Sequence, residues 1–218
     1  MGVMSAPMVH GALLFFSTYS HQLFRSGQVM IRAGETPAGI FYLVKGLVRQ
    51  YAVSPKGETL MMHVFRPGSF FPMLWALTGS ANTYQYEAVN AAEVYRAPKG
   101  DVLNFLLRHP EELWCFTKRL VGGVSGLLTR FEYIMFDGAY RKTVLLLLYF
   151  ARRFATVEDG VAVLSVPLAH REIAAWIGTT RETASVQMET LKKRGLIKTR
   201  GRQLIIPSIT ALEKEGTS

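Results

Sequence analysis

Residues 165–207 read SVPLAHREIAAWIGTTRETASVQMETLKKRGLIKTRGRQLIIP, and this stretch decides the fold of the C-terminal part of the chain. Three residues give its first helical pattern a single apolar face: Ile173, Ala174 and Ile177. Gly178 follows, and glycine readily adopts the positive φ that ends a helix. A second helical pattern begins at Thr179. The two patterns therefore predict two short helices joined by a tight turn.

The second helix is predicted to begin with a capping box. Thr179-Thr180-Arg181-Glu182 places a hydroxyl at the N-cap and a carboxylate three residues later. Spacings of four and three put three apolar side chains on one buried face: Ala184, Met188 and Leu191. Two strand patterns follow, Leu196–Lys198 and Gln203–Ile206. This order of helix, turn, helix and hairpin is typical of a winged helix-turn-helix, a module that reads DNA.

The candidate base contacts lie in the first turns of the second helix, because a recognition helix contacts bases chiefly there. They are Arg181, Glu182, Ser185 and Val186. Arg can donate two hydrogen bonds to guanine, and Glu can accept one from cytosine. Structural alternatives stay open: Glu182 can serve only the capping box, Arg181 can be a solvated side chain, and Val186 can be an exposed residue without a role. The predicted DNA-binding residues are Arg171, Thr179, Thr180, Arg181, Glu182, Thr183, Ser185, Val186, Lys193, Arg200 and Arg202.

The chain has 218 residues and a net charge of +9, spread over both halves. One stretch of eleven residues contains six cations and no acidic residue: Lys192, Lys193, Arg194, Lys198, Arg200 and Arg202. A basic cluster beside a recognition helix usually contacts phosphates. A merely solubilising basic face is the alternative.

Several classes of protein are disfavoured by composition. Cys115 is the only cysteine, so one chain has no internal disulfide, four-thiolate cluster or Cys-rich zinc site, and no metal site is expected. The longest strongly apolar run, Val144–Ala151, is too short to span a bilayer. The N-terminus lacks the charged segment of a signal peptide. These features lead us to expect a cytoplasmic protein without a membrane partner.

The N-terminal half has the pattern of an antiparallel β-structure. A weak helical pattern covers His10–Tyr19, and short apolar segments then alternate with glycine turns from Phe24 onward. Frequent short strands and turns are typical of a closed barrel or roll. The predicted strands are Val29–Ile31, Ile40–Val44, Leu47–Tyr51 and Thr59–Val64, with further strand pattern at Glu87–Ala97.

At these residues the chain resembles the Crp/Fnr family of bacterial transcription regulators. Residues 34–49, GETPAGIFYLVKGLVR, match the family's β-roll pattern, as do Gly57-Glu58 and Phe65-x-Pro67-Gly68. Residues 178–183, GTTRET, match the entry into its recognition helix. The resemblance implies a cytoplasmic homodimer that senses an effector in the roll, binds a palindromic site on double-stranded DNA, contacts RNA polymerase and has no catalytic activity.

The expected fold is α+β in three parts: an antiparallel β-roll of the double-stranded β-helix or jelly-roll type over residues 1–109, a dimerisation helix over 110–136, and a winged helix-turn-helix over 137–218. Pro110 opens the long helix. Its near-heptad apolar stripe is predicted to form the dimer interface, although it can also pack on its own domain. The stripe consists of Leu113, Phe116, Leu120, Val124, Leu127, Phe131 and Ile134.

Two further features of this region carry expectations. Gly122, Gly123 and Gly126 interrupt the long helix, and they allow close helix contact, room for a ligand or a soft joint. Asp137 is expected to cap the next helix, Tyr140–Phe154.

The sensing chemistry departs from that of the cyclic-nucleotide members which the chain resembles. Those members follow the Pro-Gly turn with a Gly-Glu pair and a later Arg, whereas no charged residue occurs here between Arg66 and Glu87. This argues against cyclic AMP, because its phosphate would lack an ion-pair partner, although backbone N–H groups can bind phosphate unaided. Large apolar residues predict either an effector pocket or core packing: Phe70, Phe71, Met73, Leu74, Trp75, Tyr84 and Tyr86.

Haem is a further alternative cofactor, with His63 and Cys115 as conceivable ligands, but no paired-ligand motif supports it. The leading hypothesis is a ligand-responsive DNA-binding regulator, and the alternatives are a ligand-independent regulator and a haem-based gas sensor. An enzyme is disfavoured because the sequence shows no paired nucleophile and base, metal-ligand spacing or phosphate-binding loop. A membrane-surface protein is disfavoured as well, because it would need an amphipathic cationic helix outside such a domain.

The resemblance also marks one departure on the recognition helix. Many relatives carry a second Arg four residues after the Glu, and Val186 stands at that position here. Valine cannot donate to guanine and can only pack, for instance on a thymine methyl group. We therefore expect a half-site that departs from the family's TGA-containing sequence at one base, while Glu182 still specifies a C·G pair.

Overall fold

The computed structural model describes residues 10–201 and 203–217, and the chain forms two compact units that divide between Gly123 and Val124. Helix α4 (Pro110–Phe136) runs through this boundary. It begins at Pro110, as the sequence predicts. Within the described ranges, no helix combines the length and apolar character needed to cross a membrane.

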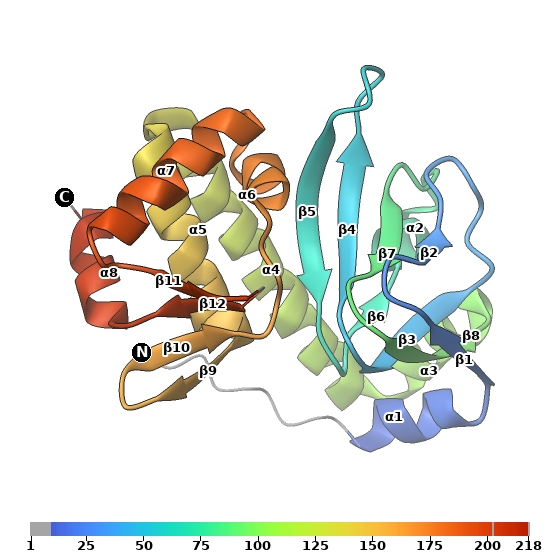
Figure 1. The fold of residues 1–218 in the computed structure, drawn as a ribbon. Coiled ribbons are helices and arrows are strands. Elements are labelled where there is room, and N and C mark those ends of the chain that lie inside the picture. The colour runs from blue at the N-terminus through green and yellow to red at the C-terminus, as the bar shows by residue number, and fades with distance from the viewer. Residues whose placement is uncertain (1–9, 202, 218) are drawn as a thin grey trace. The chain divides into compact units, whose positions relative to one another are not determined.

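The first unit contains two four-stranded sheets whose strand orders are β1-β8-β3-β6 and β2-β7-β4-β5. Neighbouring strands in both sheets pair antiparallel, and β4 and β5 form a long hairpin (Figure 1). The predicted α+β class and the antiparallel N-terminal β-structure are confirmed. The strands are β1 (Ser20–Phe24), β2 (Val29–Ile31), β3 (Ile40–Lys45), β4 (Val48–Val53), β5 (Thr59–Phe65), β6 (Phe70–Phe71), β7 (Gln85–Ala88) and β8 (Ala92–Ala97).

Alternating side chains along β3 build two separate cores. Phe41 and Leu43 face the second sheet and pack with Val48 and Tyr86. This cluster forms the interior of the roll. Ile40 and Tyr42 face the other way and pack against helices. Those helices are α1 (His10–Ser17), α2 (Met73–Thr78), α3 (Lys99–Arg108) and the start of α4.

The second unit surrounds helix α5 (Ala139–Phe154), whose buried face runs from Thr143 to Phe154. A four-stranded sheet of order β11-β12-β10-β9 accompanies three further helices. The remaining elements are β9 (Ala155–Glu158), β10 (Val161–Leu164), α6 (His170–Ile177), α7 (Arg181–Lys193), β11 (Lys198–Arg200), β12 (Gln203–Ile206) and α8 (Ile209–Thr217).

Two local predictions for this unit are wrong. The N-cap of α5 is Gly138, one residue later than the expected Asp137. Asp137 is thus too early to cap, and its carboxylate instead pairs with the Arg141 guanidinium at 3.2 Å. The first wing strand begins at Lys198 and excludes Leu196, because the Leu196 N–H donates to Leu191 O (3.0 Å) and closes the end of α7.

Candidate nucleic-acid interface

The turn between α6 and α7 is closed by a single carbonyl group. Gly178 has φ 63°, and its N–H donates to Ala174 O. The Thr179 N–H donates to the same oxygen at 3.1 Å. Both residues that follow α6 are therefore used to end that helix.

Because Thr179 serves α6, the cap of α7 falls one residue later than predicted. Thr180 is the N-cap, and its Oγ1 accepts from the Thr183 N–H at 3.2 Å. The predicted capping box on Thr179 is thus wrong, and Glu182 stands at the second helical position instead of the third. Within the described residues no hydrogen bond holds the Glu182 carboxylate. The alternative that Glu182 serves only a capping box is therefore not supported.

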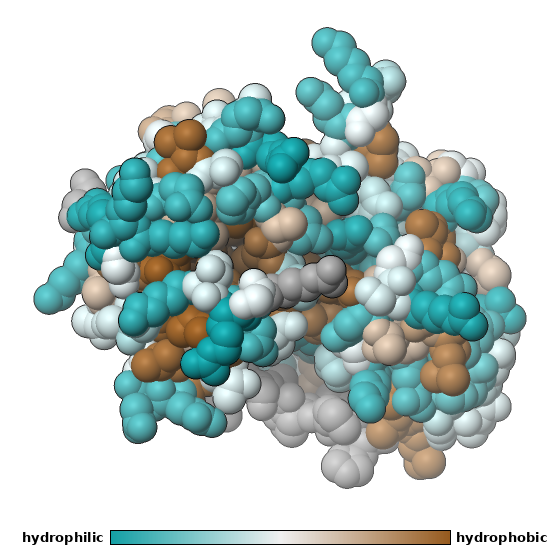
Figure 2. All heavy atoms as spheres, in the orientation of Figure 1, coloured by the Kyte–Doolittle hydropathy of each residue, from teal (hydrophilic) through white to brown (hydrophobic). Residues whose placement is uncertain are grey.

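Helix α7 has one buried and one open face. Ala184, Met188 and Leu191 are buried, as predicted. On the other side Arg181 and Glu182 are exposed, Ser185 is half-buried and Val186 is 60% exposed. Hydrophilic side chains cover most of the surface over α7 (teal in Figure 2). The four residues singled out as base contacts thus share the accessible start of this helix.

The other predicted DNA-binding residues take several positions. Thr180 and Thr183 join their hydroxyls at 3.0 Å, so both help to build the cap. Thr179 is half-buried. The cations Arg171, Lys193 and Arg200 are exposed, whereas Arg202 lies outside the described residues.

Arg194 has a different environment from the rest of the basic cluster. Its Nη1 donates to the Tyr140 hydroxyl at 2.7 Å, and its Nη2 pairs with a Glu215 carboxylate oxygen at 2.7 Å. These contacts tie the end of α7 to α5 and α8. Lys192 pairs with Glu189 at 2.8 Å on α7 itself. The sequence cluster therefore contains cations that are already engaged.

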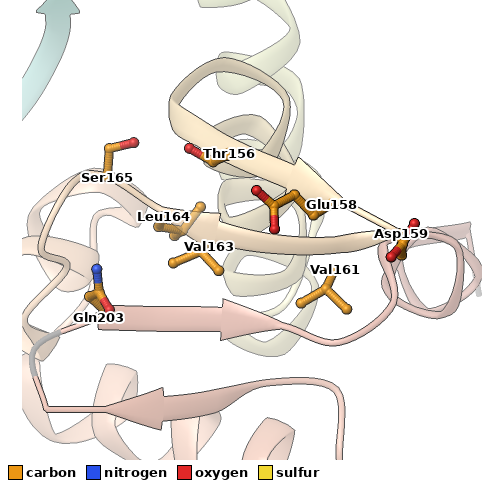
Figure 3. A pocket seen from close by; sticks show the side chains of 8 residues that line it. All are labelled: Thr156, Glu158, Asp159, Val161, Val163, Leu164, Ser165 and Gln203. Atoms are coloured by element: carbon orange, nitrogen blue, oxygen red, sulfur yellow. The ribbon is translucent and has the colours of Figure 1, made fainter.

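A hollow of about 570 Å³ lies on the wing sheet of the same unit. Figure 3 shows Val161 and Val163 along β10 and the carboxylates of Glu158 and Asp159 near the hairpin turn. Asp159 adopts a positive φ of 49° in that turn. In Figure 1, β9 and β10 lie away from α7 within this unit. Eight residues line the hollow: Thr156, Glu158, Asp159, Val161, Val163, Leu164, Ser165 and Gln203.

The predicted effector residues separate into two groups. Phe71 and Tyr86 stack inside the roll with ring centroids 5.4 Å apart, and Phe65 stacks on Phe71 at 4.8 Å. Burial raises the pKa of the Tyr86 phenol far above its ordinary value, and Gln50 Nε2 donates to its oxygen at 3.0 Å. Tyr84 packs at the edge of this core.

The second group lies in the helical core or on the surface. Phe70 stacks on Phe116 of α4 at 5.1 Å, and Met73 is buried nearby. Trp75 is partly buried, with Lys99 Nζ 4.9 Å from its ring centroid, while Leu74 is 57% exposed. The seven side chains are thus spread over both sides of the first sheet.

Two sets of polar contacts lie in the segment between Arg66 and Glu87, which contains no charged residue. Asn82 is 5% exposed, and its Nδ2 donates to Arg32 O and Tyr84 O, each at 2.9 Å. Arg119 of α4 donates from Nη1 to Gly68 O at 2.6 Å and from Nη2 to Ser69 Oγ at 3.1 Å. The Arg119 contacts were not anticipated, because nothing in the sequence pairs residues this far apart.

The conceivable haem ligands lie on separate elements. His63 is on β5, with its ring edge-on to Phe65 at 4.6 Å, and Cys115 is half-buried on α4. Among the residues that the structure describes, no three His, Cys, Asp or Glu side chains are grouped to hold a metal ion.

Helix α4 exposes a broad apolar stripe. Five of the predicted interface residues are exposed: Leu113, Leu120, Val124, Leu127 and Phe131. Ile134 is half-buried, and Phe116 packs against Phe70 of its own chain. A second exposed row was missed, although its sevenfold spacing is visible in the sequence: Trp114, Val121, Leu128 and Met135.

The sequence matches two family models, one within each of the two units. Residues 21–109 match the cyclic nucleotide-binding domain, and residues 142–215 match the Crp-like helix-turn-helix domain. The chain is 25% identical over 203 residues to the global nitrogen regulator of Nostoc sp., covering 90% of this chain and 89% of that protein. It is 29% identical over 178 residues to the transcriptional regulator SdrP of Thermus thermophilus, covering 80% and 83%.

Solved structures share the fold. A CRP/FNR-family transcriptional regulator from Thermus thermophilus aligns with a TM-score of 0.72 at 24% identity, covering 91% of this chain and 99% of that one. The c-di-GMP responsive global regulator CLP of Xanthomonas campestris aligns with a TM-score of 0.77 at 16% identity, covering 91% and 99%. With its roll, its long helix and its winged helix-turn-helix, the chain belongs to the Crp/Fnr family of DNA-binding transcription regulators and not to an enzyme family.

Proposed function

We propose that the protein acts in the cytoplasm as a homodimer that reads a palindromic DNA site with Arg181 and Glu182. The observation that carries this proposal is the position of the α7 cap at Thr180. It leaves both side chains exposed in the first helical turn, where a recognition helix meets base edges. Arg181 suits guanine O6 and N7, and Glu182 suits cytosine N4.

Selection of bound sequences from random DNA tests this reading. Glu182→Gln should relax the preference for a C·G pair at one position of each half-site, and Arg181→Ala should relax a preference for guanine, each by about 1–3 kcal/mol. Thr210→Ala, on the exposed surface of α8, is the matched control. Unchanged motifs in both variants would contradict the proposed contacts.

The dimer is proposed from the exposed apolar rows of α4. Val124→Glu should convert the protein to a monomer in sedimentation experiments and abolish preferential binding to palindromes. Thr129→Glu places the same charge on the opposite face of the helix and should leave the dimer intact. A Val124→Glu variant that remains dimeric would exclude this interface.

For the effector, we propose a ligand other than a cyclic nucleotide. Asn82, a neutral residue in the uncharged segment that follows the Pro67-Gly68 turn, already donates its amide hydrogens to backbone carbonyls. A cyclic phosphate would meet no charged side chain from the segment between Arg66 and Glu87. Cyclic AMP should therefore leave both the thermal midpoint and the DNA affinity unchanged, while an apolar effector should raise both.

A ligand-independent regulator is the second candidate, favoured by the contacts of Arg119. This side chain already joins α4 to the Gly68–Ser69 turn, and the stacked Phe71 and Tyr86 rings occupy the roll interior. In that case the purified protein should bind its site at full affinity without any added metabolite. Extraction and mass spectrometry of the purified protein, with an absorbance spectrum for haem, separates the two candidates.

A contact with RNA polymerase is proposed for the hollow of the wing sheet. Glu158 and Asp159 would repel DNA phosphates, so this surface suits a protein better than a nucleic acid. Val163→Glu should lower transcription from a target promoter without lowering DNA affinity. Equal losses in both measurements would exclude the hollow as a polymerase contact.

A further inference from the structure

We propose that Arg130 of α4 is a positioning residue that sets the spacing at which the two recognition helices meet their half-sites. The inference rests on the homodimer proposed above. It concerns a side chain outside the recognition helix and outside the exposed apolar rows of α4. Arg130 joins the long helix to the first helix of the DNA-binding motif.

The contact itself is a cation over an indole ring. The Arg130 guanidinium carbon lies 5.1 Å from the centroid of the Trp176 ring, a distance typical of a cation–π interaction. Trp176 is 4% exposed and lies on α6, two residues before the glycine that turns the chain into α7. Its ring also packs on Tyr149 at 5.9 Å and on Phe150 at 5.4 Å. Arg130 thus contacts the Trp176 ring, through which α6 packs on α5.

Arg130 and its neighbour Tyr133 are both withdrawn from solvent. Tyr133, one turn further along α4, is 9% exposed, and burial raises the pKa of its phenol to about 12. Burial also lowers the pKa of Arg130, although a guanidinium stays charged at any physiological pH. A charge in such a place costs desolvation that an apolar side chain of similar size would avoid. The π-face of Trp176 attracts the guanidinium only over a restricted range of angles, so this contact is directional.

Helix α4 presents different partners on its two sides. Leu128 and Phe131 are 59% and 64% exposed, and they belong to the rows proposed for dimerisation. Arg130 and Tyr133 lie on a different side of the helix from these rows, and Arg130 contacts Trp176 within the second unit. One rigid turn of helix therefore holds both the dimer contact and the α6 contact. Fixing Trp176 against this turn fixes the distance of α7 from the dimer axis.

Loss of the contact should widen the range of distances between α7 and the dimer axis. The contacts between α7 and the bases should stay the same. The experiment measures the affinity of full-length variants for three kinds of DNA. The first is a palindrome whose half-site centres are separated by about 10 base pairs. The others are palindromes lengthened or shortened by one and two base pairs, and a single half-site. Arg130→Met removes the cation and keeps the volume. The expected result is an at least tenfold weaker preference for the best spacing, with half-site affinity unchanged.

Three controls make the result specific. Arg130→Lys keeps a cation over the ring and should restore most of the spacing preference. Trp176→Phe weakens the same contact from the other side and should lower the preference even where Arg130→Met fails to fold. Arg153→Met removes a different guanidinium, 5.3 Å from the Tyr149 ring in the same aromatic cluster, and should leave the spacing preference unchanged.

The outcomes separate this inference from the proposed homodimer. A wild-type protein that sediments as a monomer and ignores spacing overturns the homodimer and the inference together. A dimer in which Arg130→Met and Trp176→Phe keep the wild-type spacing preference overturns the inference alone. Parallel losses for palindrome and single half-site also overturn it, because they indicate general destabilisation of the DNA-binding unit.

Discussion

Thr179 and Thr180 show how a single backbone hydrogen bond assigns a residue's role. Either threonine can cap α7 by residue type alone, and the Glu three residues after Thr179 favours the first. The bond from the Thr179 N–H to Ala174 O commits that residue to ending α6. The cap therefore moves to Thr180, and Glu182 is released toward the solvent.

Val186 carries the sharpest prediction at the residue scale. It is 60% exposed on the open face of α7, and a valine can only pack against a base. Val186→Arg should add a preference for guanine at one position of each half-site, worth about 1–3 kcal/mol in sequence selection. Thr210→Arg adds the same charge on α8 and should raise affinity without changing the motif. A Val186→Arg variant with the wild-type motif would place Val186 outside the groove.

At the scale of elements, the packing of α1 on α4 depends on a carboxyl group. Glu112 of α4 is 5% exposed, and its Oε1 accepts from the Ala12 N–H at 3.1 Å. Burial is the main cause that raises the pKa of Glu112 above the ordinary 4.5, with a further rise from the neighbouring Glu111 carboxylate. The folded chain therefore binds this proton more tightly than the unfolded chain does. Its contribution to stability is present at low pH and is lost as pH rises from 4.5 through the raised pKa.

Glu112→Gln keeps an acceptor for the Ala12 N–H and removes the ionisation. The variant should become increasingly more stable than the wild type as pH rises from 4.5 toward neutrality, because only the wild type must ionise a buried group. Chemical denaturation at several pH values measures the difference. Glu58→Gln, on an exposed residue of the turn between β4 and β5, is the control. Parallel stability curves for Glu112→Gln and the wild type would contradict the assignment.

Gly122 gives a second prediction at the element scale. It is exposed on the face of α4 opposite the apolar rows, and an added Cβ would meet no other described atom within 4 Å. Gly122→Ala should raise the free energy of unfolding by about 1 kcal/mol, the usual gain in a helix interior. Thermal denaturation checks this value. A simultaneous loss of DNA affinity would indicate that the glycine acts as a soft joint, whereas a loss of stability would contradict the prediction.

The periodicity of apolar residues predicts the long helix correctly, but it predicts less well which of its side chains are exposed. Phe116 fits the near-heptad stripe by spacing, yet it stacks on Phe70, which the sequence does not place nearby. Strand β6 and helix α2 are not among the predicted elements, because their aromatic residues show no clear period and equally suggest the lining of a pocket. Local patterns therefore predicted elements, while contacts between distant segments decided which side chains were free.

At the scale of the whole molecule, the net charge attracts DNA phosphates over a distance. Cations that already bind groups of the protein should contribute less to phosphate contacts. The net charge is +9, but Arg194 is already bound to Tyr140 and Glu215. Lys193→Ala and Arg200→Ala should each lower the slope of log affinity against log salt by about 1. Arg194→Ala should leave this slope unchanged while lowering stability. Titrations at several salt concentrations measure the slopes, and an equal change in all three variants would show that Arg194 also contacts phosphate.

The sevenfold spacing of Trp114, Val121, Leu128 and Met135 has a consequence for the shape of any pair of α4 helices. A straight α-helix drifts by about 20° per heptad, so a strict row of this length rotates by roughly 60° around its own axis. Two such helices keep their rows in contact only by winding around each other in a left-handed supercoil. The pitch of that supercoil, and not only the strength of the contact, would then decide how far one end of the dimer is turned relative to the other.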